Sequence, residues 1–464
     1  MKQSIKILFS LLTSLVLLSC SSPPTARPPD ATNSIVARAW FEDRTHEIVA
    51  HAEKLIEKNR KEGAVLDQRW YGLKYFGKHQ ELIFNAAKVM FFGGLEVDVR
   101  TQFGDQYASL EPVEDNQDPG DIRLFVGKRK QGDYDFIIIG QNGREVALKT
   151  IIRLLYLATF IDEETRQKYR DKLESFKKSL KVSFSSASAR QEFIAFFRRH
   201  GIRDVDAVLI GFRGDIRSLM KDESISDPES YADESLRVNW YKNANGKKVL
   251  LVSIDGNRIF GSRSGDLIEA VLAVSASSSN PPSITFLGSA GSLDAPEMIG
   301  KIVTPTSVMN DDSLSASRDK GFLIHIIRNR AADEATTKTA AVSVESVVAE
   351  TTQWAKNMKD HRISTVDQEL FHIVNAINSS PYAGRIDAFI GSLVTDNVSS
   401  DALRSDATLE YAEEVISKTA DIRKEFLSKV LRKIGILKNK TGWRLHSSPS
   451  SESRAVRVPV RRYS

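Results

Sequence analysis

Two carboxylates in the second half of the sequence stand where an enzyme could use them. Asp396 follows an apolar run that begins at Ile390, and a carboxyl group at the end of a buried strand can be desolvated enough to hold a proton near neutral pH, as a general acid must. Glu369 ends the motif VDQE at residues 366–369, where it could accept hydrogen bonds from a sugar diol. Each acid also has a structural interpretation: an Asx turn at a strand exit for Asp396, and a carboxylate that favours a helix dipole for Glu369.

A third segment, ITFLGSAGSL at residues 284–293, is typical of a strand that runs into a turn of small residues. Gly288, Ala290 and Gly291 would let backbone N–H groups approach a ligand, and Ser289 adds a hydroxyl. Small-residue turns after strands are common, so this segment indicates a site only in combination with the two acids.

The three segments lie in a part of the chain where apolar strands alternate with helices. We expect strands over 206–211, 249–252, 284–287, 302–303, 322–326 and 386–394, and helices over 265–274, 366–377 and 409–434. This alternation is typical of an α/β domain, placed here at 204–440, whose sheet is covered by helices on both faces. Ligands of such sheets bind at the carboxyl ends of the strands, where the candidate residues fall.

The order and spacing of the motifs resemble the nucleoside phosphorylase and nucleosidase superfamily, which includes the purine nucleoside phosphorylases and the methylthioadenosine/S-adenosylhomocysteine nucleosidases. GSAG is followed by VDQE about 80 residues later and by VTDN about 27 residues after that. Ile210-Gly211, the helix after Gly261 and the segment 300–303 resemble further family segments. The resemblance spans roughly residues 205–435. It implies a three-layer phosphorylase-like sandwich around a central mixed sheet that closes partly into a barrel.

The resemblance also implies roles for single residues. Asp396 matches the acid that protonates or hydrogen-bonds a purine at N7, and an aspartate there favours 6-aminopurines such as adenine. Glu369 matches the carboxylate that grips the ribose hydroxyls, with the backbone of Gln368 nearby. Ser289, with Gly288, Ala290 and Gly291 around it, matches the pocket of the nucleophile.

Residues expected to surround the purine base are less firmly placed. Asn397, which follows Asp396 directly, is assigned to the base pocket by the same resemblance. Thr351, Thr352 and Trp354 lie where members of the family often contact the base. A tryptophan at such a position is more often part of the core.

Water and phosphate are the two nucleophiles that this superfamily uses. Hexameric phosphorylases carry an arginine two residues before the small-residue turn, where this chain has Phe286, and this difference favours hydrolysis. Gly214-Asp215-Ile216-Arg217 resembles the phosphate loop of those enzymes shortened by one residue, so Arg217 is the candidate phosphate ligand. Asp215 is the acid nearest to the glutamate with which nucleosidases activate water.

The expected function is therefore cleavage of the N-glycosidic bond of purine nucleosides of the adenosine or methylthioadenosine type. An enzyme of this kind would be an N-glycosyl hydrolase or a nucleoside phosphorylase, without a cofactor and with phosphate as the only conceivable co-substrate. Two alternatives remain open: a nucleoside-binding or sensor protein of the same fold without turnover, and a structural scaffold. An acid at both 369 and 396 disfavours the scaffold, because a scaffold needs neither.

The first half of the chain shows no chemistry of its own. Residues 35–203 are predicted to form a mostly helical domain of unknown role, because apolar residues recur at helical spacing over much of it. Short strands are expected over 95–103 and 121–126. Its histidines show no metal-ligand spacing, and we predict no metal site.

Cys20 is the single cysteine of the 464 residues, which excludes an intramolecular disulfide and a cysteine-based zinc site. It follows Leu17-Leu18-Ser19 at the end of an apolar run, an arrangement that resembles the bacterial lipobox. The sequence thus predicts a lipoprotein signal peptide over 1–20, a lipid on Cys20, and a linker over 21–34. With Ser21 rather than aspartate after the cysteine, we expect a lipid anchor in the cell envelope, at the outer membrane.

Composition and net charge limit the kinds of partner that the chain is expected to have. The chain is 41% hydrophobic and 27% charged, which is ordinary for a globular protein. A net charge of +5 spread over 464 residues does not indicate nucleic acid. The basic residues gather near the C-terminus, and we expect a disordered basic tail over 441–464. The expected partners are a nucleoside and, through the lipid, a membrane; a homo-oligomer remains open.

Overall fold

The computed structural model describes residues 40–438 apart from 62–72, 114–121, 161–162, 169, 223–227, 234, 244–245, 254–258, 277–279, 294–295, 312–323, 327–328, 334–336, 346–351 and 399–408. The expected signal peptide, the lipidation site Cys20, the linker, the basic tail and Thr351 all lie outside the described residues. Among the helices within these ranges, none combines the length and the apolar character needed to span a bilayer.

The first described part of the chain is built on a six-stranded sheet. Its strand order is β1 (Phe41–Asp43), β6 (Leu180–Ser185), β2 (Lys88–Gly93), β5 (Tyr134–Gly140), β4 (Ile122–Arg129) and β3 (Tyr107–Pro112). Strands β6, β2 and β5 run parallel, and the remaining three pair antiparallel with their neighbours. Helices hold more of the described residues of this part than strands do, as expected, but its core is organised by a sheet of which only short strands were expected.

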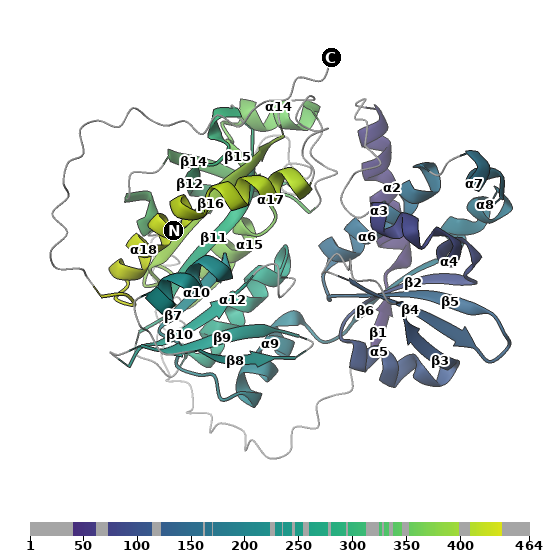
Figure 1. Cartoon of the computed structure of the whole chain (residues 1–464), viewed down its shortest axis with the longest axis horizontal. Coiled ribbons are helices and arrows are strands. Elements are labelled where there is room, and N and C mark those ends of the chain that lie inside the picture. Colours follow the sequence, from purple (N-terminus) through teal and green to yellow (C-terminus); the bar gives the residue numbers. More distant parts are fainter. Residues whose placement is uncertain are drawn as a thin grey trace, which may run out of the picture. The chain divides into compact units, whose positions relative to one another are not determined.

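Helices lie on both faces of this sheet (Figure 1). Phe136 and Ile138 of β5 point into a core with the helices of one face, whereas Ile137 and Ile139 point toward α5 on the other. The helices are α2 (Thr45–Lys61), α3 (Leu73–Lys78), α4 (Gln80–Asn85), α5 (Glu96–Phe103), the 3₁₀ turn η1 (Gly104–Gln106), α6 (Arg144–Phe160), α7 (Glu163–Lys168) and α8 (Arg170–Ser179).

The two strands expected in this part had different outcomes. The strand expected over 121–126 is confirmed as β4. The strand expected over 95–103 is wrong, because residues 96–103 form helix α5, with two acids in its first turn. Acids near the positive end of a helix dipole stabilise it, and this effect outweighs the weak alternation of apolar residues.

The second part contains a ten-stranded mixed sheet. Strand β16 pairs with both β11 and β12, so β12, β14, β15, β11 and β16 form a closed ring of strands, which is the partial barrel expected from the sequence. The strands are β7 (Ala207–Gly211), β8 (Glu229–Ala232), β9 (Arg237–Lys242), β10 (Lys248–Val252), β11 (Ser283–Ser292), β12 (Ile302–Asn310), β13 (Ile324–His325), β14 (Thr337–Ser343), β15 (Thr365–Asp367) and β16 (Ala388–Asn397).

Helices cover both faces of this sheet as well, which confirms the three-layer arrangement (Figure 1). Val208 and Ile210 of β7 pack against α9, α12 and α15, while Ala207 and Leu209 pack against α10 and α18. The helices are α9 (Ala189–Arg199), α10 (Arg213–Asp222), α12 (Ser262–Val274), the turns η2 (Pro296–Met298) and η3 (Arg330–Asp333), α14 (Thr352–Asp360), α15 (Leu370–Ser379), α17 (Leu409–Lys418) and α18 (Ala420–Lys433).

Four expected boundaries in this domain were wrong. Strand β11 continues to Ser292, so residues 288–291 are strand rather than turn. Strand β16 likewise continues through Asn397. Residues 365–367 form strand β15, and helix α15 begins only at Leu370. The region 409–434, expected as one helix, is two helices, α17 and α18.

Candidate functional site

The three motifs meet at one residue, Gly291 of β11. In the antiparallel pairing with β15, Gly291 stands opposite Val366, and in the parallel pairing with β16 it stands opposite Asp396. Neighbouring strands lie about 4.8 Å apart, so the backbones of Val366 and Asp396 are only about 10 Å from each other across β11. Segments more than a hundred residues apart in the sequence are thereby brought to one place.

The space around Gly291 explains why the residue is small. A Cβ atom added there would lie 2.9 Å from a methyl group of Val398, 3.1 Å from one of Val366 and 3.3 Å from Oδ2 of Asp396. The pairing with β16 also shifts register between Ala290 and Gly291. Such irregularities redirect side chains and are frequent near functional sites. Any larger residue would push the Asp396 carboxyl group aside.

Asp396 has the environment that a general acid needs. Burial raises the pKa of its carboxyl group, and a hydrogen bond of 2.8 Å that Thr395 Oγ1 donates to Asp396 Oδ1 acts in the opposite direction. Because Oδ1 accepts this bond, Oδ2 is the oxygen that would carry a proton beside Gly291.

Glu369 is buried at the junction between β15 and α15, where it is the residue that precedes the helix. Its backbone N–H donates to Asp367 Oδ1 at 2.9 Å, and its backbone carbonyl accepts from the Ile373 N–H at 3.1 Å. Gln368, which lies between Asp367 and Glu369 in the sequence, is half-buried. The expected ribose-binding segment is therefore a fixed corner and not part of a helix.

Asp367 is a residue whose importance the sequence analysis missed. Its Oδ1 accepts hydrogen bonds from the Ser343 hydroxyl at 2.8 Å and from the N–H groups of Glu369 and Leu370, both at 2.9 Å. Its Oδ2 is buried and has no hydrogen-bond partner among the described residues. Burial raises the pKa of this carboxyl group to about 6. Its position two residues before Glu369 could have drawn attention to it.

This pKa predicts how Asp367→Asn should behave. An Asp pKa raised from 3.8 to about 6 means that the folded state binds the proton more tightly, so stability falls as pH rises between those values. The asparagine keeps the Oδ1 acceptor but carries no charge. At pH 7.5 its free energy of unfolding should therefore exceed that of the wild type by up to about 3 kcal/mol, and it should unfold at a higher temperature. The gap should narrow to about 1 kcal/mol at pH 4.5, because the unfolded state still loses the proton above 3.8. Thermal unfolding at both pH values checks this, and a gap independent of pH would contradict it.

The small-residue segment presents one accessible hydroxyl. Ser289 is exposed, whereas its strand neighbours Gly288 and Ala290 are buried. A Cβ on Gly288 would lie 2.5 Å from the ring of Phe286, which is itself buried in the core. The phenylalanine that stands where hexameric phosphorylases are expected to carry an arginine thus packs inside the domain.

Asp215 is engaged in a buried ion pair. Its Oδ2 accepts a hydrogen bond of 2.6 Å from Nε of Arg423, which joins α10 to α18. The guanidinium of Arg423 also lies 4.4 Å from the centre of the Phe212 ring and 3.0 Å from Thr419 Oγ1. The carboxylate expected to activate water is therefore already held by a cation.

Arg217 is exposed on α10 and belongs to a group of cations. Burial and the nearby charges of Arg217 and Arg237 lower the pKa of Arg213, whose Nε donates to Asn239 at 2.6 Å. The positive charges of Arg217 and Arg237 thus act on Arg213, and like charges that act on one another attract anions.

The expected base-pocket residues are only partly described. Asn397 is buried at the end of β16. Thr352 begins helix α14, and Thr351 lies outside the described residues. Trp354 is buried in an apolar cluster and donates from Nε1 to Asp311 at 2.9 Å, in agreement with a core role.

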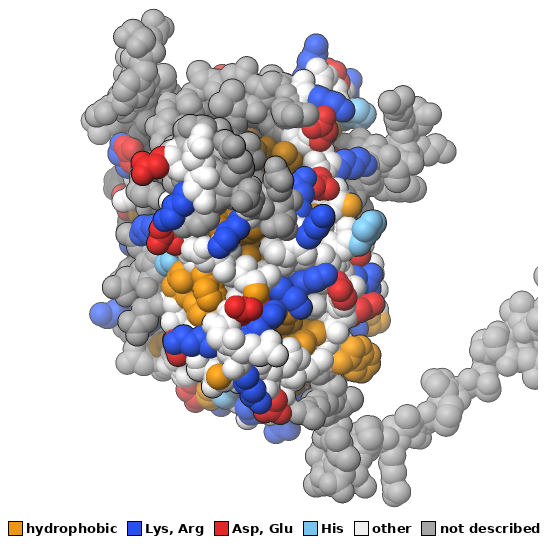
Figure 2. Space-filling model, turned by 90° about the vertical axis from the view of Figure 1, so that its right-hand side faces the viewer, with side chains coloured by type: hydrophobic (Ala, Val, Ile, Leu, Met, Phe, Trp, Pro, Cys, Tyr) orange, Lys and Arg blue, Asp and Glu red, His pale blue; other side chains and the backbone are white. Residues whose placement is uncertain are grey.

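Metal-ligating side chains do not gather in the described part of the chain: it contains no group of three or more His, Cys, Asp or Glu side chains placed to hold an ion. On the face drawn in Figure 2, basic and acidic side chains intermingle.

Comparison with known proteins finds similarity in structure only. No protein-family model and no curated protein matches the sequence. The 5′-methylthioadenosine/S-adenosylhomocysteine nucleosidase of Helicobacter pylori is 15% identical, with a TM-score of 0.39 over 50% of this chain and 99% of that one. A mutant of the futalosine hydrolase of H. pylori is 13% identical, with a TM-score of 0.39 over 49% of this chain and 99% of that one.

A methylthioadenosine phosphorylase from an antarctic soil metagenomic library is 17% identical, with a TM-score of 0.37 over 50% of this chain and 87% of that one. Across about half of its length, the chain is therefore similar in fold to these three structures.

Proposed function

We propose that the domain at 204–440 cleaves the N-glycosidic bond of purine nucleosides of the adenosine or methylthioadenosine type, with water as the nucleophile. One observation carries the proposal: Gly291 pairs with Val366 on one side and with Asp396 on the other, so the ribose-binding and acid motifs flank the same small-residue strand. A scaffold would have no need of a half-buried acid with a raised pKa at this point.

In the proposed reaction the bond between the sugar C1′ and the purine nitrogen breaks, and its electron pair leaves with the base. Asp396 donates a proton to the departing purine, while the negative charge of Glu369 stabilises the cationic sugar through its hydroxyls. Water adds to C1′ and releases a proton to the solvent, from which Asp396 is protonated again, so that the products are free sugar and free base. Ser289, exposed between buried neighbours, would help to place the nucleophile.

Phosphorolysis is the second candidate, and one observation favours it. Arg213, Arg217 and Arg237 lie close enough to lower the pKa of Arg213, and Arg217 stands in the segment that resembles a phosphate loop. Against it, Phe286 is buried in the core where hexameric phosphorylases carry an arginine. A nucleoside-binding protein without turnover would share the same corner.

The test is release of adenine from adenosine and methylthioadenosine, with and without phosphate. Hydrolysis predicts adenine and free sugar at the same rate in both conditions. Absolute dependence on phosphate, with a sugar 1-phosphate as product, would identify a phosphorylase. Binding of adenosine without release of adenine in either condition would leave the sensor as the function.

A further inference from the structure

The start of helix α12 is held by an acid from the six-stranded part of the chain. Glu145, in the first turn of α6, is buried, and its Oε1 accepts a hydrogen bond of 3.0 Å from the Ser262 N–H. Its Oε2 accepts one of 3.1 Å from the Ser262 hydroxyl. The first N–H groups of a helix have no partner within it, so this carboxylate both satisfies one of them and favours the helix dipole.

The backbone before α12 is shaped to receive this carboxylate. Gly261 has φ +56° and ψ −133°, a combination that residues with a side chain rarely adopt. A Cβ at this position would lie 2.6 Å from Cδ of Glu145. Gly261 therefore has two roles: it allows the backbone to turn, and it leaves room for the Glu145 carboxylate.

From this turn a second hydrogen bond leads to the proposed ribose-binding residue. The Ser264 hydroxyl lies 2.7 Å from the Gly261 carbonyl and 3.1 Å from the Glu369 carbonyl, and shares its proton between them. Helices α12 and α15 also approach closely, because a Cβ on Gly265 would lie 2.8 Å from the His372 carbonyl. Glu145 is thus linked to the Glu369 backbone through the first turn of α12.

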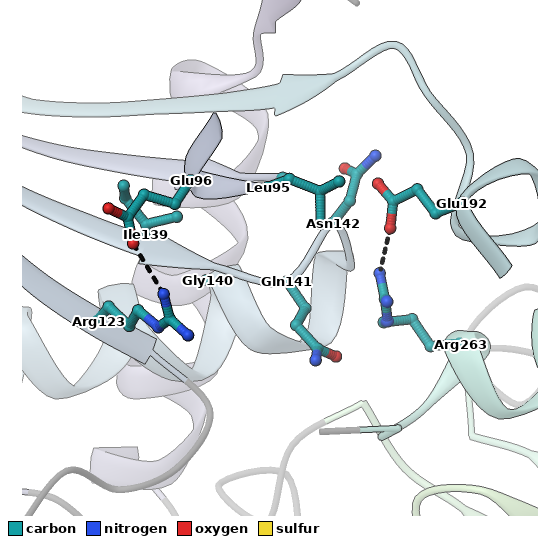
Figure 3. A pocket seen from close by; sticks show the side chains of 10 residues that line it. Leu95, Glu96, Arg123, Ile139, Gly140, Gln141, Asn142, Glu192 and Arg263 are labelled. Atoms are coloured by element: carbon teal, nitrogen blue, oxygen red, sulfur yellow. Dashed lines mark hydrogen bonds and ion pairs between the residues drawn. The ribbon is translucent and has the colours of Figure 1, made fainter. Parts of the chain in front are cut away.

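The residue between the two serines fixes the same turn from another side. Arg263 is buried and lies 3.4 Å from Glu192 of α9, and its guanidinium stands 4.8 Å from the centre of the Phe193 ring. Figure 3 shows this pair at a pocket whose other side is lined by Gln141 and Asn142, which follow strand β5. The turn is therefore clamped at consecutive residues and has little freedom to shift.

We propose that Glu145 is a positioning residue for Glu369, so that the six-stranded part of the chain is a working part of the candidate active site. Glu145 would not touch the nucleoside. It fixes the first turn of α12, whose Ser264 holds the Glu369 carbonyl and with it the corner from which the Glu369 carboxylate reaches the sugar. This inference rests on the proposed function for its effect on catalysis.

Activity provides the first arm of the test. Glu145→Ala removes both acceptors for Ser262, and two lost hydrogen bonds should lower kcat/KM for adenosine about 10-fold, mainly through KM. Glu145→Gln keeps an acceptor for the N–H group and should stay within about 3-fold of the wild type. Glu111→Ala, which removes an exposed partner of Lys128, serves as the matched control and should leave the activity unchanged.

Hydrogen exchange provides the second arm and needs no catalysis. The Ile373 N–H donates to the Glu369 carbonyl, so its exchange reports on the corner directly. Glu145→Ala should speed the exchange of both Ser262 and Ile373, whereas Ser264→Ala should speed only that of Ile373. A wild type without nucleosidase activity would refute the proposed function alone. Unchanged exchange at Ile373 in folded Glu145→Ala and Ser264→Ala proteins would overturn the positioning role.

Discussion

Asp396→Asn should lower the turnover of adenosine cleavage by about 100-fold or more, the usual range for loss of a general acid, and leave nucleoside binding nearly intact. The asparagine has the size and shape of the aspartic acid, and its Oδ1 can still accept the hydrogen bond from Thr395. Its amide can donate a hydrogen bond to the purine but cannot give up a proton. Rates from single turnovers and dissociation constants from calorimetry measure the two effects separately.

The pH dependence should change in the same variant. Burial raises the pKa of Asp396, so the wild-type acid stays protonated to higher pH than an exposed aspartate, and activity should fall as pH rises through that pKa. The asparagine variant should lack this decline. Asp421→Asn, at an exposed position in the first turn of α18, is the matched control. Equal losses of binding and rate in Asp396→Asn would mean that the residue only holds the structure.

The place of the acids could be predicted from the sequence because their neighbours are locally informative. An apolar run that ends in Thr395-Asp396 indicates a buried strand with a polar end, and the structure confirms that strand as β16. Its true length could not be predicted. The strand pairs with β11 as far as Asn397 although its last residues are polar. A buried backbone N–H or C=O group without a hydrogen bond would cost more free energy than placing these polar residues in a strand.

The first sheet was harder to predict for a different reason. The apolar run at Phe136–Ile139 and the apolar helix that begins at Arg144 follow each other closely, and a short buried strand cannot be told from a buried helix by periodicity. Gly140, where the strand ends, is the local signal that could have separated them. Its backbone is pressed against Phe91, because an added Cβ would lie 2.7 Å from that ring.

The contacts that hold the site in place leave no signal in the sequence at all. Glu145 and Ser262 are 117 residues apart, and nothing in the neighbourhood of either indicates the other. Gly261 carries a hint only in retrospect, as a glycine before a helix. Long-range pairs of this kind depend on the packing of whole elements, and they decide which of several plausible acids is available for chemistry.

Asp215 is the acid for which such a long-range pair matters most. Its removal should lower the stability of the domain more than the rate of catalysis. Asp215→Ala leaves the buried Arg423 guanidinium with Thr419 and the Phe212 ring but without its counter-ion, which should destabilise the domain by about 3 kcal/mol or more. Adding Arg423→Met should recover much of that loss, because the isolated charge is then gone. Urea unfolding of the single and double variants measures both steps.

The catalytic alternative gives the opposite pattern. If Asp215 activated the attacking water, Asp215→Asn would abolish hydrolysis while the fold stayed stable, and Arg423→Met would not restore it. The ion pair instead predicts that folded Asp215→Asn protein cleaves adenosine within a few-fold of the wild-type rate, since the amide oxygen can still accept from Arg423 Nε. In the proposed reaction the water would then have to be placed by other groups, such as the exposed Ser289 hydroxyl, while Glu369 and Asp396 supply the charge and the proton.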